Sequence, residues 1–426
     1  MPATKTGKDA EVTSTDVEAK LLEFFTRNHD DGGKSVAPQD LLTMRQETIA
    51  TGKHSRTRLV EVKKLNSFLQ RELPGADDLL CTNREPTIQD PPEVGLGIFA
   101  LKVMKKSEVA RLKEVDHVKA EADILSRLNH PFLISLYHRF QDERNLCLLT
   151  EFVQLGSLAT HINRNHQLPN NTARFYAAQI VMAVQFLHAE HIIFRNLSPH
   201  SVWLDRQNYI KLVDFSFAKG INLDDPSVRS WTVVGEPEYM SPEMVCSKGH
   251  SKEVDWWALG VMIHEMLAGY PPFFGMTSFD IYKMIQKNEE IAMPKHFDEQ
   301  GKDLLKKLLV RDRTKRIGSS KNGAEDIKKH KWYRGLNWAA LYNKQISPLP
   351  LHFTNGDPLG SYKEGVPTGD GVPCLTCART PTGGPDVSNF SKERSSTTTD
   401  YPNSSEEQGP LLDQEKDEAL FGSWGK

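Results

Sequence analysis

A lysine and a glutamate 19 residues apart are the first residues in this sequence whose types and spacing could do chemistry. Lys102 lies in the run FALKVMKK, a pattern that predicts a strand with the lysine on the face opposite its flanking hydrophobic residues. Glu121 follows in VDHVKAEADIL, which has the pattern of a helix. A lone lysine on a strand is usually a solvated side chain, so this pair alone does not define a function.

Four further segments change that interpretation because they follow in a characteristic order: VDFSFAK (213–219), GEPEYMSPE (235–243), VDWWALGV (254–261) and RDRTKRIG (311–318). Their order and spacing resemble those of a protein kinase. The segments at 130–140, 174–188 and 321–333 resemble the AGC group, and most of all the catalytic subunits of cyclic-AMP-dependent protein kinases. The resemblance implies an α+β fold: a bilobal protein kinase with a β-rich N-lobe, a helical C-lobe and an AGC-type C-terminal tail.

The hydrophobic patterns alone agree with strands followed by helices. They predict strands at Phe99–Met104, Leu146–Phe152, Val202–Leu204 and Ile210–Val213, and helices at Thr172–His188, Asp255–Leu267 and Asp303–Leu309. We expect three regions: an N-terminal extension (1–67), partly disordered with a short helix over Val17–Arg27 as one alternative; a kinase-like domain (68–333); and an AGC-type tail with a low-complexity insert (334–426).

Three positions match the family's nucleotide-handling residues. The resemblance assigns Lys102 and Glu121 to the ion pair that positions the α- and β-phosphates of ATP, and Asp214 to Mg²⁺. The catalytic loop departs from the family pattern YRDLKPEN and has FRNLSPHS at 194–201. The catalytic base position is therefore Asn196, the loop lysine is Ser198 and the second metal ligand is Ser201.

These replacements predict impaired catalysis. A neutral amide can orient a hydroxyl but cannot take its proton, and loss of a general base typically costs about 10²- to 10⁴-fold in rate. Ser201 has a shorter side chain than the asparagine it replaces, which withdraws an oxygen from the metal. ATP and Mg²⁺ are the cofactors if nucleotide binds at all.

The glycine-rich loop is expected about 22 residues before the strand lysine. Counting back from Lys102 reaches Leu80, Thr82 and Glu85 in place of glycines, and Gly95 and Gly97 lie too near the lysine to do the same work. The sequence therefore predicts a lost phosphate loop, with a gene-model error around 79–93 as the alternative.

The adenine site has one conspicuous replacement. The resemblance places Ala100, Glu151 and Val153 around the base, and puts Trp203 where the family has a leucine beneath it. We expect the indole to fill the pocket itself, in a packed column with Ala100, Val202, Leu204 and Met262. The alternative is that Trp203 turns outward.

Other features of the family are retained. Leu125, Leu136, Phe194 and Phe215 match a stacked hydrophobic spine anchored by Asp255, and Glu243 with Arg316 matches a buried ion pair. Thr232 falls on the activation-segment phosphosite, and His117, Arg195 and Lys219 match its phosphate ligands. A solvated threonine beside unrelated cations is the simpler alternative.

Substrate recognition looks altered. Three acidic positions that the family uses for basic substrates are Ser157, His200 and Glu265 in this chain, and Glu236 replaces a threonine. Trp231 and Tyr282 match aromatic positions that dock a regulatory subunit, although simple surface packing would also explain them. In the tail, Phe390 resembles a segment that crosses the hinge, while Phe421 and Trp424 resemble the terminal hydrophobic motif that docks on the N-lobe.

Composition excludes several classes of protein. With 53 Lys and Arg against 56 Asp and Glu, the net charge of −3 gives no long-range attraction to nucleic acid or acidic lipid. The most apolar stretch, Trp256–Tyr270, is too short for about 30 Å of hydrocarbon, and no signal core or myristoylation site is present, so we expect no membrane anchor. Cys374 and Cys377 form a CxxC without a second pair, which leaves a zinc-binding tail adaptor as an outside alternative.

The first hypothesis is therefore a pseudokinase: a cyclic-AMP-dependent-kinase-like binding or allosteric module in the cytoplasm, with nuclear access also open. Its expected partners are proteins, such as a regulatory subunit or an upstream activating kinase. The alternative is a serine/threonine kinase with residual ATP-dependent transfer to protein substrates.

Overall fold

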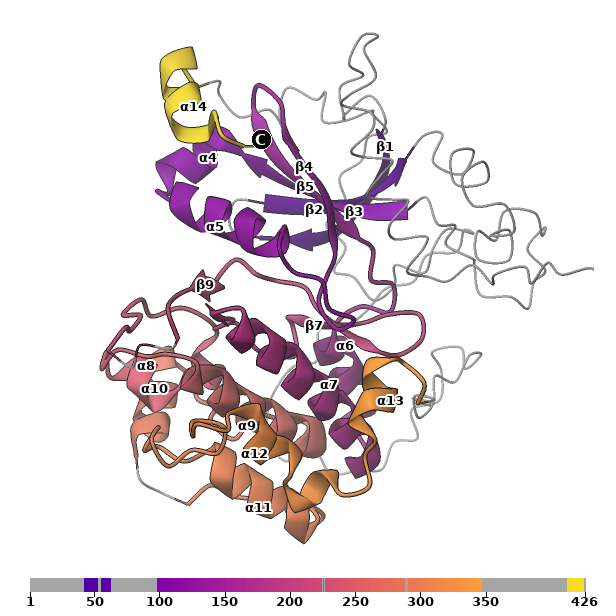
Figure 1. Cartoon of the computed structure of the whole chain (residues 1–426), viewed down its shortest axis with the longest axis vertical. Coiled ribbons are helices and arrows are strands. Elements are labelled where there is room, and N and C mark those ends of the chain that lie inside the picture. Colours follow the sequence, from indigo (N-terminus) through magenta and orange to yellow (C-terminus); the bar gives the residue numbers. More distant parts are fainter. Residues whose placement is uncertain are drawn as a thin grey trace, which may run out of the picture.

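The computed structural model describes residues 42–52, 55–62, 98–223, 225, 227–287, 290–346 and 412–424, without the side chains of 44–47. A β-sheet with helices beside it forms one lobe and a set of helices forms the other, as Figure 1 shows. This arrangement confirms the α+β bilobal fold.

The N-lobe is built on a five-stranded antiparallel sheet in the order β1-β2-β3-β5-β4. The strands are β1 (Leu42–Thr51), β2 (Ser55–Val62), β3 (Ile98–Lys105), β4 (Leu136–Gln141) and β5 (Asn145–Glu151). Helices α4 (Lys106–Arg111) and α5 (Val115–Leu125) follow β3. The predicted strands at 99–104 and 146–152 are thus confirmed.

Two strands of the sheet lie before residue 68, where the kinase-like domain was expected to start. Strands β1 and β2 lie inside the segment assigned to an N-terminal extension, and β2 pairs with β3 from Ser55↔Met104 to Glu61↔Ile98. Residues 63–97 separate the two paired strands in sequence and lie outside the described residues. The sheet therefore begins 26 residues before the expected start of the domain, as 68 − 42 = 26.

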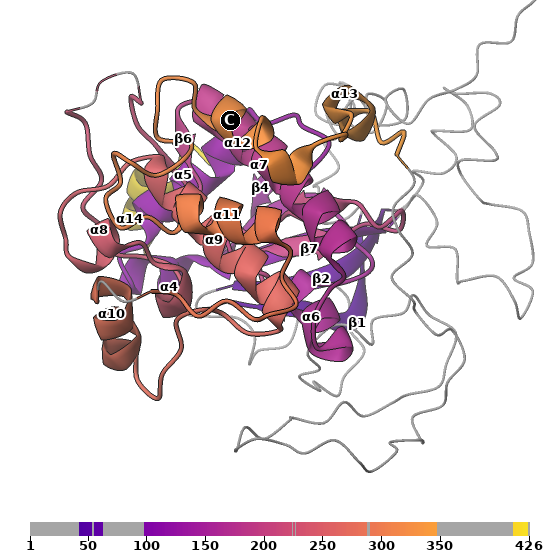
Figure 2. The ribbon, with the colours of Figure 1, turned by 90° about the horizontal axis from the view of Figure 1, so that it is seen from below.

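The C-lobe consists of helices around α7 (Asn170–Ala189) and α9 (Glu253–Ala268), which pack against each other. Its other elements are α6 (Leu158–Asn165), β6 (Ile192–Ile193), β7 (Val202–Leu204), β8 (Ile210–Leu212), β9 (Lys219–Gly220), η2 (Pro237–Tyr239), α8 (Pro242–Val245), α10 (Ser278–Gln286), α11 (Glu299–Leu308), α12 (Ala324–Lys328), η3 (Lys331–Tyr333) and α13 (Trp338–Tyr342). Figure 2 shows α7, α9, α11 and α12 gathered in this lobe.

Local sequence signals explain the ends of these helices. Thr277 and Asp298 accept hydrogen bonds from the backbone at the starts of α10 and α11. Gly269 ends α9 with φ of 86°, and a Cβ there would lie 1.8 Å from the carbonyl oxygen of His166. Only glycine fits this turn, which fixes the direction in which the chain leaves α9.

A last helix, α14 (Gln414–Phe421), lies beside α4 and α5 on the N-lobe, as Figure 1 shows. In the described part of the chain, no helix has the length and apolar character needed to cross a membrane.

Candidate active site

The strand lysine and the helix glutamate meet within the N-lobe. Lys102 Nζ on β3 lies 2.6 Å from Glu121 Oε1 and 2.8 Å from Oε2 on α5. Burial by itself lowers the pKa of Lys102, but the negative charges of Glu121 and Asp214 outweigh it and hold the pKa above its usual value. The Lys102 ammonium group is therefore held in place by Glu121, near enough to Asp214 to interact with its charge.

Asn196 and Asp214 are joined directly. Asn196 Nδ2 donates to Asp214 Oδ2 over 2.9 Å, and the backbone N–H of Ser216 donates to Asp214 Oδ1 over 3.2 Å. A carboxylate accepts hydrogen bonds, so the amide nitrogen of Asn196 has to face it. Both oxygens at the position assigned to the metal-binding carboxylate thus already accept a protein N–H group.

The two loop serines are also engaged. Ser201 is 2% exposed. Its Oγ accepts from the N–H of Ser198 over 3.1 Å and donates to the carbonyl oxygen of Ser198 over 3.0 Å. Ser198 Oγ donates to Glu236 Oε1 over 2.7 Å. The Ser201 hydroxyl therefore closes a turn of its own loop rather than facing Asp214.

Trp203 packs against a small hydrophobic cluster that is separate from the main core. The residue is half-buried on β7, its Nε1 donates to the carbonyl oxygen of His200 over 3.0 Å, and it packs against a cluster formed by Ile49, Leu59, Ala100 and Phe152. The expected column is divided, however, because Val202, Leu204 and Met262 belong to the separate main core. The indole joins the N-lobe residues that contain Ala100.

A second buried cation, Lys211, contacts the end of β5, where the chain leaves the N-lobe sheet. Lys211 on β8 is 6% exposed, and its Nζ lies 2.7 Å from Glu151 Oε1 and 3.2 Å from the carbonyl oxygen of Leu133. Glu151 Oε1 also accepts from the N–H of Ser135. The hinge position Val153 is 3% exposed. Sequence reasoning missed Lys211, which has no distinctive motif around it.

The turn that precedes β3 in the sheet is not where the count of residues placed it. β1 and β2 form the hairpin next to β3, and Gly52 N–H donates to the carbonyl oxygen of Ser55 over 2.8 Å at its turn. Leu80, Thr82, Glu85, Gly95 and Gly97 lie outside the described residues. A count from Lys102 assumes a short β2–β3 connection, and the segment 63–97 breaks that assumption. In the sequence, the sign of this turn was Gly52, which is flanked by polar residues.

The residues assigned to structural roles come together. The rings of Phe194 and Phe215 lie 5.1 Å apart, while Leu125 is buried and Leu136 half-buried in the same core. Asp255 accepts from the N–H groups of Phe194 and Arg195 over 3.0 and 2.8 Å, which ties the catalytic loop to α9.

A buried ion pair braces the segment that follows. Arg316 donates to both oxygens of Glu243 over 2.7 and 3.0 Å, and both side chains are at most 4% exposed. Such a two-pronged contact holds α8 against the loop that carries Arg316.

The activation segment brings together only part of the expected phosphate site. Arg195 Nη1 donates to Ser230 Oγ over 3.0 Å and to Thr232 Oγ1 over 3.2 Å, and Lys219 Nζ donates to Ser230 Oγ over 3.4 Å. Burial lowers the pKa of Arg195 to about 10. His117 does not join them, because its Nδ1 lies 2.5 Å from Glu114. Glu114 is the residue that precedes α5, three positions before His117.

The three positions expected to face a substrate, Ser157, His200 and Glu265, have different surroundings. Ser157 caps α6 by accepting from the N–H of Thr160, and His200 is exposed. Glu265 accepts from the hydroxyl of Tyr239, and burial raises its pKa to about 7. Of these three, only Glu265 is built into a polar contact with the segment around Tyr239.

The two proposed docking aromatics are unlike each other. Trp231 is 65% exposed, whereas Tyr282 is half-buried and packs on the main core. Trp231 therefore offers most of the free aromatic surface at this site.

The tail aromatics dock on the N-lobe. Phe421 is 0% and Trp424 5% exposed, and Trp424 Nε1 donates to the carbonyl oxygen of Phe140 over 2.8 Å. Lys106, itself 2% exposed, lies 2.8 Å from Asp417 of α14. Phe390, Cys374 and Cys377 lie outside the described residues, and within the described ranges no group of three His, Cys, Asp or Glu residues could hold a metal ion.

With this geometry in place, the class of protein follows. The model of the protein kinase domain matches residues 96–333, and the chain belongs to that family. Similar proteins include a "cAMP-dependent protein kinase catalytic subunit" of Dictyostelium discoideum, 47% identical over 247 residues that make up 58% of this chain and 37% of the relative.

Two further relatives carry similar names. The "cAMP-dependent protein kinase catalytic subunit 3" of Drosophila melanogaster is 46% identical over 61% of this chain and 44% of its own length. The human "cAMP-dependent protein kinase catalytic subunit PRKX" is 45% identical over 64% of this chain and 74% of its own length. The chain thus spans less than half of the first two relatives.

Proposed function

We propose that this chain is a cyclic-AMP-dependent-kinase-like pseudokinase that serves as a binding and allosteric module, with little or no phosphotransfer. The observation that carries the proposal is the 2.9 Å contact between Asn196 Nδ2 and Asp214 Oδ2. The amide replaces a proton acceptor and at the same time engages the carboxylate assigned to the metal. Either effect slows phosphotransfer, because the reaction depends on positioned charge and metal.

Membership of the protein kinase family implies ATP and Mg²⁺ as cofactors in general. The residues of this chain fit that pair poorly. Lys102 is held by Glu121 as the family pattern requires, but Asp214 accepts from Asn196 and Ser216, and the Ser201 hydroxyl donates to its own loop. Trp203 adds a steric objection, since its indole packs on Ala100 in the expected adenine site.

A second candidate is a serine/threonine kinase with residual ATP-dependent transfer. Two observations favour it: the formed Lys102–Glu121 pair and the β1–β2 hairpin, whose turn contains Gly52. A kinase of this type needs a substitute for the missing base.

Partners follow from the docking surfaces. The exposed Trp231 supports contact with a regulatory-subunit-like protein, and Arg195 beside Thr232 supports modification by an upstream kinase. We place this activity in the cytoplasm, with nuclear access open, and assign it to a domain that starts at β1 and ends near residue 333.

Calorimetric titration of the full chain with Mg-ATP, paired with a peptide phosphorylation assay, tests the proposal. We expect no micromolar binding and no transfer above that of the Lys102→Ala variant. Transfer at a typical kinase rate of about 1–100 s⁻¹ that Lys102→Ala abolishes would refute the pseudokinase assignment.

A further inference from the structure

The part of the activation segment from Ser230 to Tyr239 meets its surroundings at several successive points. At its start, Ser230 and His250 exchange two backbone hydrogen bonds of 2.8 Å, and the Ser230 hydroxyl accepts from Arg195 Nη1 over 3.0 Å. Ser230 is 0% exposed. These contacts fasten the start of the segment to the catalytic loop and to the residues before α9, without a phosphate.

Gly235 brings the middle of the segment directly onto the backbone of the catalytic loop. Its φ is 100°, in the region that favours glycine, and a Cβ built on it would lie 2.9 Å from the carbonyl oxygen of Arg195. A side chain at this position would push the segment away from the loop. The space that remains, which Asn196, Ser198 and Glu236 help to line, holds about one water molecule.

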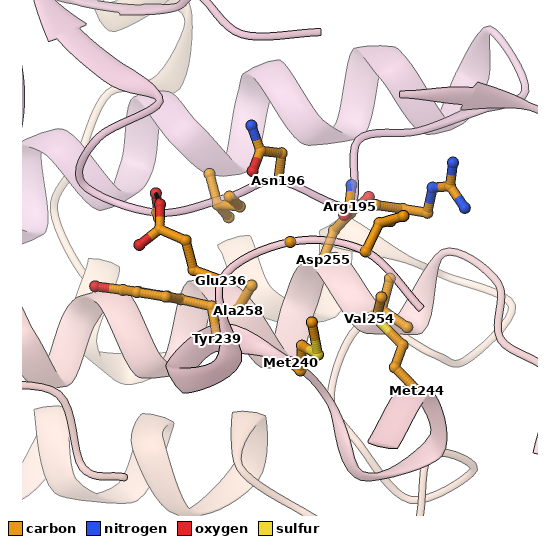
Figure 3. A pocket seen from close by; sticks show the side chains of 13 residues that line it. Arg195, Asn196, Glu236, Tyr239, Met240, Met244, Val254, Asp255 and Ala258 are labelled. Atoms are coloured by element: carbon orange, nitrogen blue, oxygen red, sulfur yellow. Dashed lines mark hydrogen bonds between the residues drawn. The ribbon is translucent and has the colours of Figure 1, made fainter. Parts of the chain in front are cut away.

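Glu236 makes the next contact with the catalytic loop. Its Oε1 accepts from the hydroxyl of Ser198 over 2.7 Å, and Ser198 is 2% exposed. We call this hydrogen bond the loop clasp. Figure 3 shows Glu236 and Tyr239 on one side of the small space and Arg195 on the other. A hydrogen bond to a carboxylate is stronger than one between neutral groups, and exclusion of water strengthens it further.

The end of the segment is fastened to α9. The hydroxyl of Tyr239 donates to Glu265, and burial raises the pKa of Tyr239 well above its usual value, so this hydroxyl keeps its proton. The segment is therefore held at both ends, and the loop clasp joins it to the catalytic loop between them.

Thr232 adds little to this set of contacts. Its hydroxyl shares Arg195 Nη1 with Ser230, at the longer distance of 3.2 Å, and the residue is exposed. Arg195 also donates to the carbonyl oxygen of Phe217 over 2.8 Å, so its guanidinium is already held in place. A phosphate on Thr232 would add charge-assisted bonds to a segment whose position other contacts already determine.

From these contacts we propose that the loop clasp replaces phosphorylation of Thr232 as the device that orders the activation segment, so that the segment keeps its place in the unmodified chain. The inference rests on the proposed binding function, because a binding module that needs no activating phosphate presents the same surface whether or not another kinase has acted on it. The carboxylate of Glu236 is part of the sequence, whereas a phosphate has to be added by an enzyme.

Hydrogen exchange of the full chain, followed by mass spectrometry on peptides that cover 230–239, tests the proposal. The samples are the unmodified chain, Ser198→Ala, and the chain with phosphothreonine incorporated at position 232 during translation. We expect Ser198→Ala to exchange about tenfold faster than the unmodified chain, because Glu236 loses its donor. Phosphothreonine should slow exchange by less than about twofold, because the segment is already ordered.

Ser227→Ala is the matched control. It also removes a serine hydroxyl that donates to a carboxylate, that of Asp225 over 2.6 Å, but at an exposed position. Exchange over 230–239 should not change in this variant, and thermal melting checks that each variant folds. Glu236→Gln keeps the shape of the side chain without its charge, and its exchange should lie between those of the unmodified chain and Ser198→Ala.

Two results overturn the proposal. One is exchange in Ser198→Ala that equals that of Ser227→Ala, and the other is exchange that phosphothreonine slows by more than about twofold. Both are separate from the test of the proposed function. Peptide phosphorylation at an ordinary kinase rate refutes the pseudokinase assignment whatever the exchange data show, while either exchange result in a chain without transfer refutes the loop clasp alone.

Discussion

The side-chain nitrogen of Asn196 lies 2.9 Å from a carboxylate oxygen of Asp214 and donates a hydrogen bond to it. The residue at the position assigned to the base is thus hydrogen-bonded to the residue assigned to the metal. In this arrangement, each residue satisfies the other. A carboxylate in place of the amide would be repelled by Asp214 unless a cation stood between them.

Restoration of the catalytic loop should therefore create activity. We expect the Asn196→Asp, Ser201→Asn double variant to raise the ATP-dependent transfer rate by about 10²- to 10⁴-fold, because a proton acceptor returns and Asp214 is released. Radiometric peptide phosphorylation measures the rate. Lys102→Ala in the same background should abolish the gain. A double variant as inactive as the original chain would place the defect elsewhere, for instance at Trp203.

Removal of the indole tests the filled adenine site. Trp203→Leu should bind ATP at least about tenfold more tightly, because the indole packs where the nucleotide is expected, and should lose roughly 1–3 kcal/mol of stability. Calorimetry and urea unfolding provide the two measurements. Trp231→Leu is the matched control, since that indole is 65% exposed and its loss should change stability by less than about 0.5 kcal/mol. Unchanged affinity in Trp203→Leu would contradict the filled pocket.

The tail helix depends on one largely buried charge pair. Asp417→Ala leaves Lys106 unpaired at 2% exposure, which should cost up to about 3–5 kcal/mol, limited by the free energy with which α14 docks. Hydrogen exchange at β4 should then quicken, because Trp424 would leave the carbonyl oxygen of Phe140.

Its controls distinguish charge from packing. Glu415→Ala, at an exposed position of α14, should leave exchange unchanged. Lys106→Met combined with Asp417→Leu should recover most of the docking, since neither residue then requires a partner. Exchange at β4 that does not respond to Asp417→Ala would show that the aromatic contacts suffice.

Two buried histidines predict acid sensitivity. Burial lowers the pKa values of His130 and His250 to about 4, with Lys211 adding to the effect at His130 and Arg195 at His250. Because these groups charge more readily in the unfolded chain, their stabilisation is complete above pH 6.5 and is lost as the pH falls toward 4. Glu265, whose pKa burial raises to about 7, acts in the opposite direction between pH 4.5 and 7.

The expected net result is a stability that declines below about pH 6. His250→Gln should reduce this decline by at most about 1.4 kcal/mol per pH unit, as measured by urea unfolding between pH 4.5 and 7. His200→Gln, at an exposed position, should leave the slope unchanged. Parallel slopes for His250→Gln and the unaltered chain would contradict the role of His250.

The sequence was enough for the bilobal fold because its long periodic segments and ordered motifs agree with one another. It did not place β1 and β2. Their alternating threonines and arginines resemble a polar extension, and only pairing across 63–97 reveals them as neighbours of β3. A count of residues from Lys102 measures sequence distance, whereas the sheet is determined by register.

The sequence predicted which residues form the candidate site better than it predicted the contacts that they make. Lys102 and Glu121 meet as the motif implies, since a strand and a following helix can bring them together. The direction of the Asn196 amide and the turn closed by Ser201 depend on local hydrogen bonds that no motif specifies. The contact of His117 with Glu114, the residue that precedes α5, is likewise a local pairing that no motif specifies.

Lys211 and Glu151 tie strand β8 to the end of β5 at the crossing between the lobes. A hinge rotation that separated β8 from β5 would leave the buried ammonium group of Lys211 without its carboxylate partner. This ion pair therefore opposes rotation of one lobe against the other. A partner that separates the lobes must supply Lys211 with water or with another carboxylate.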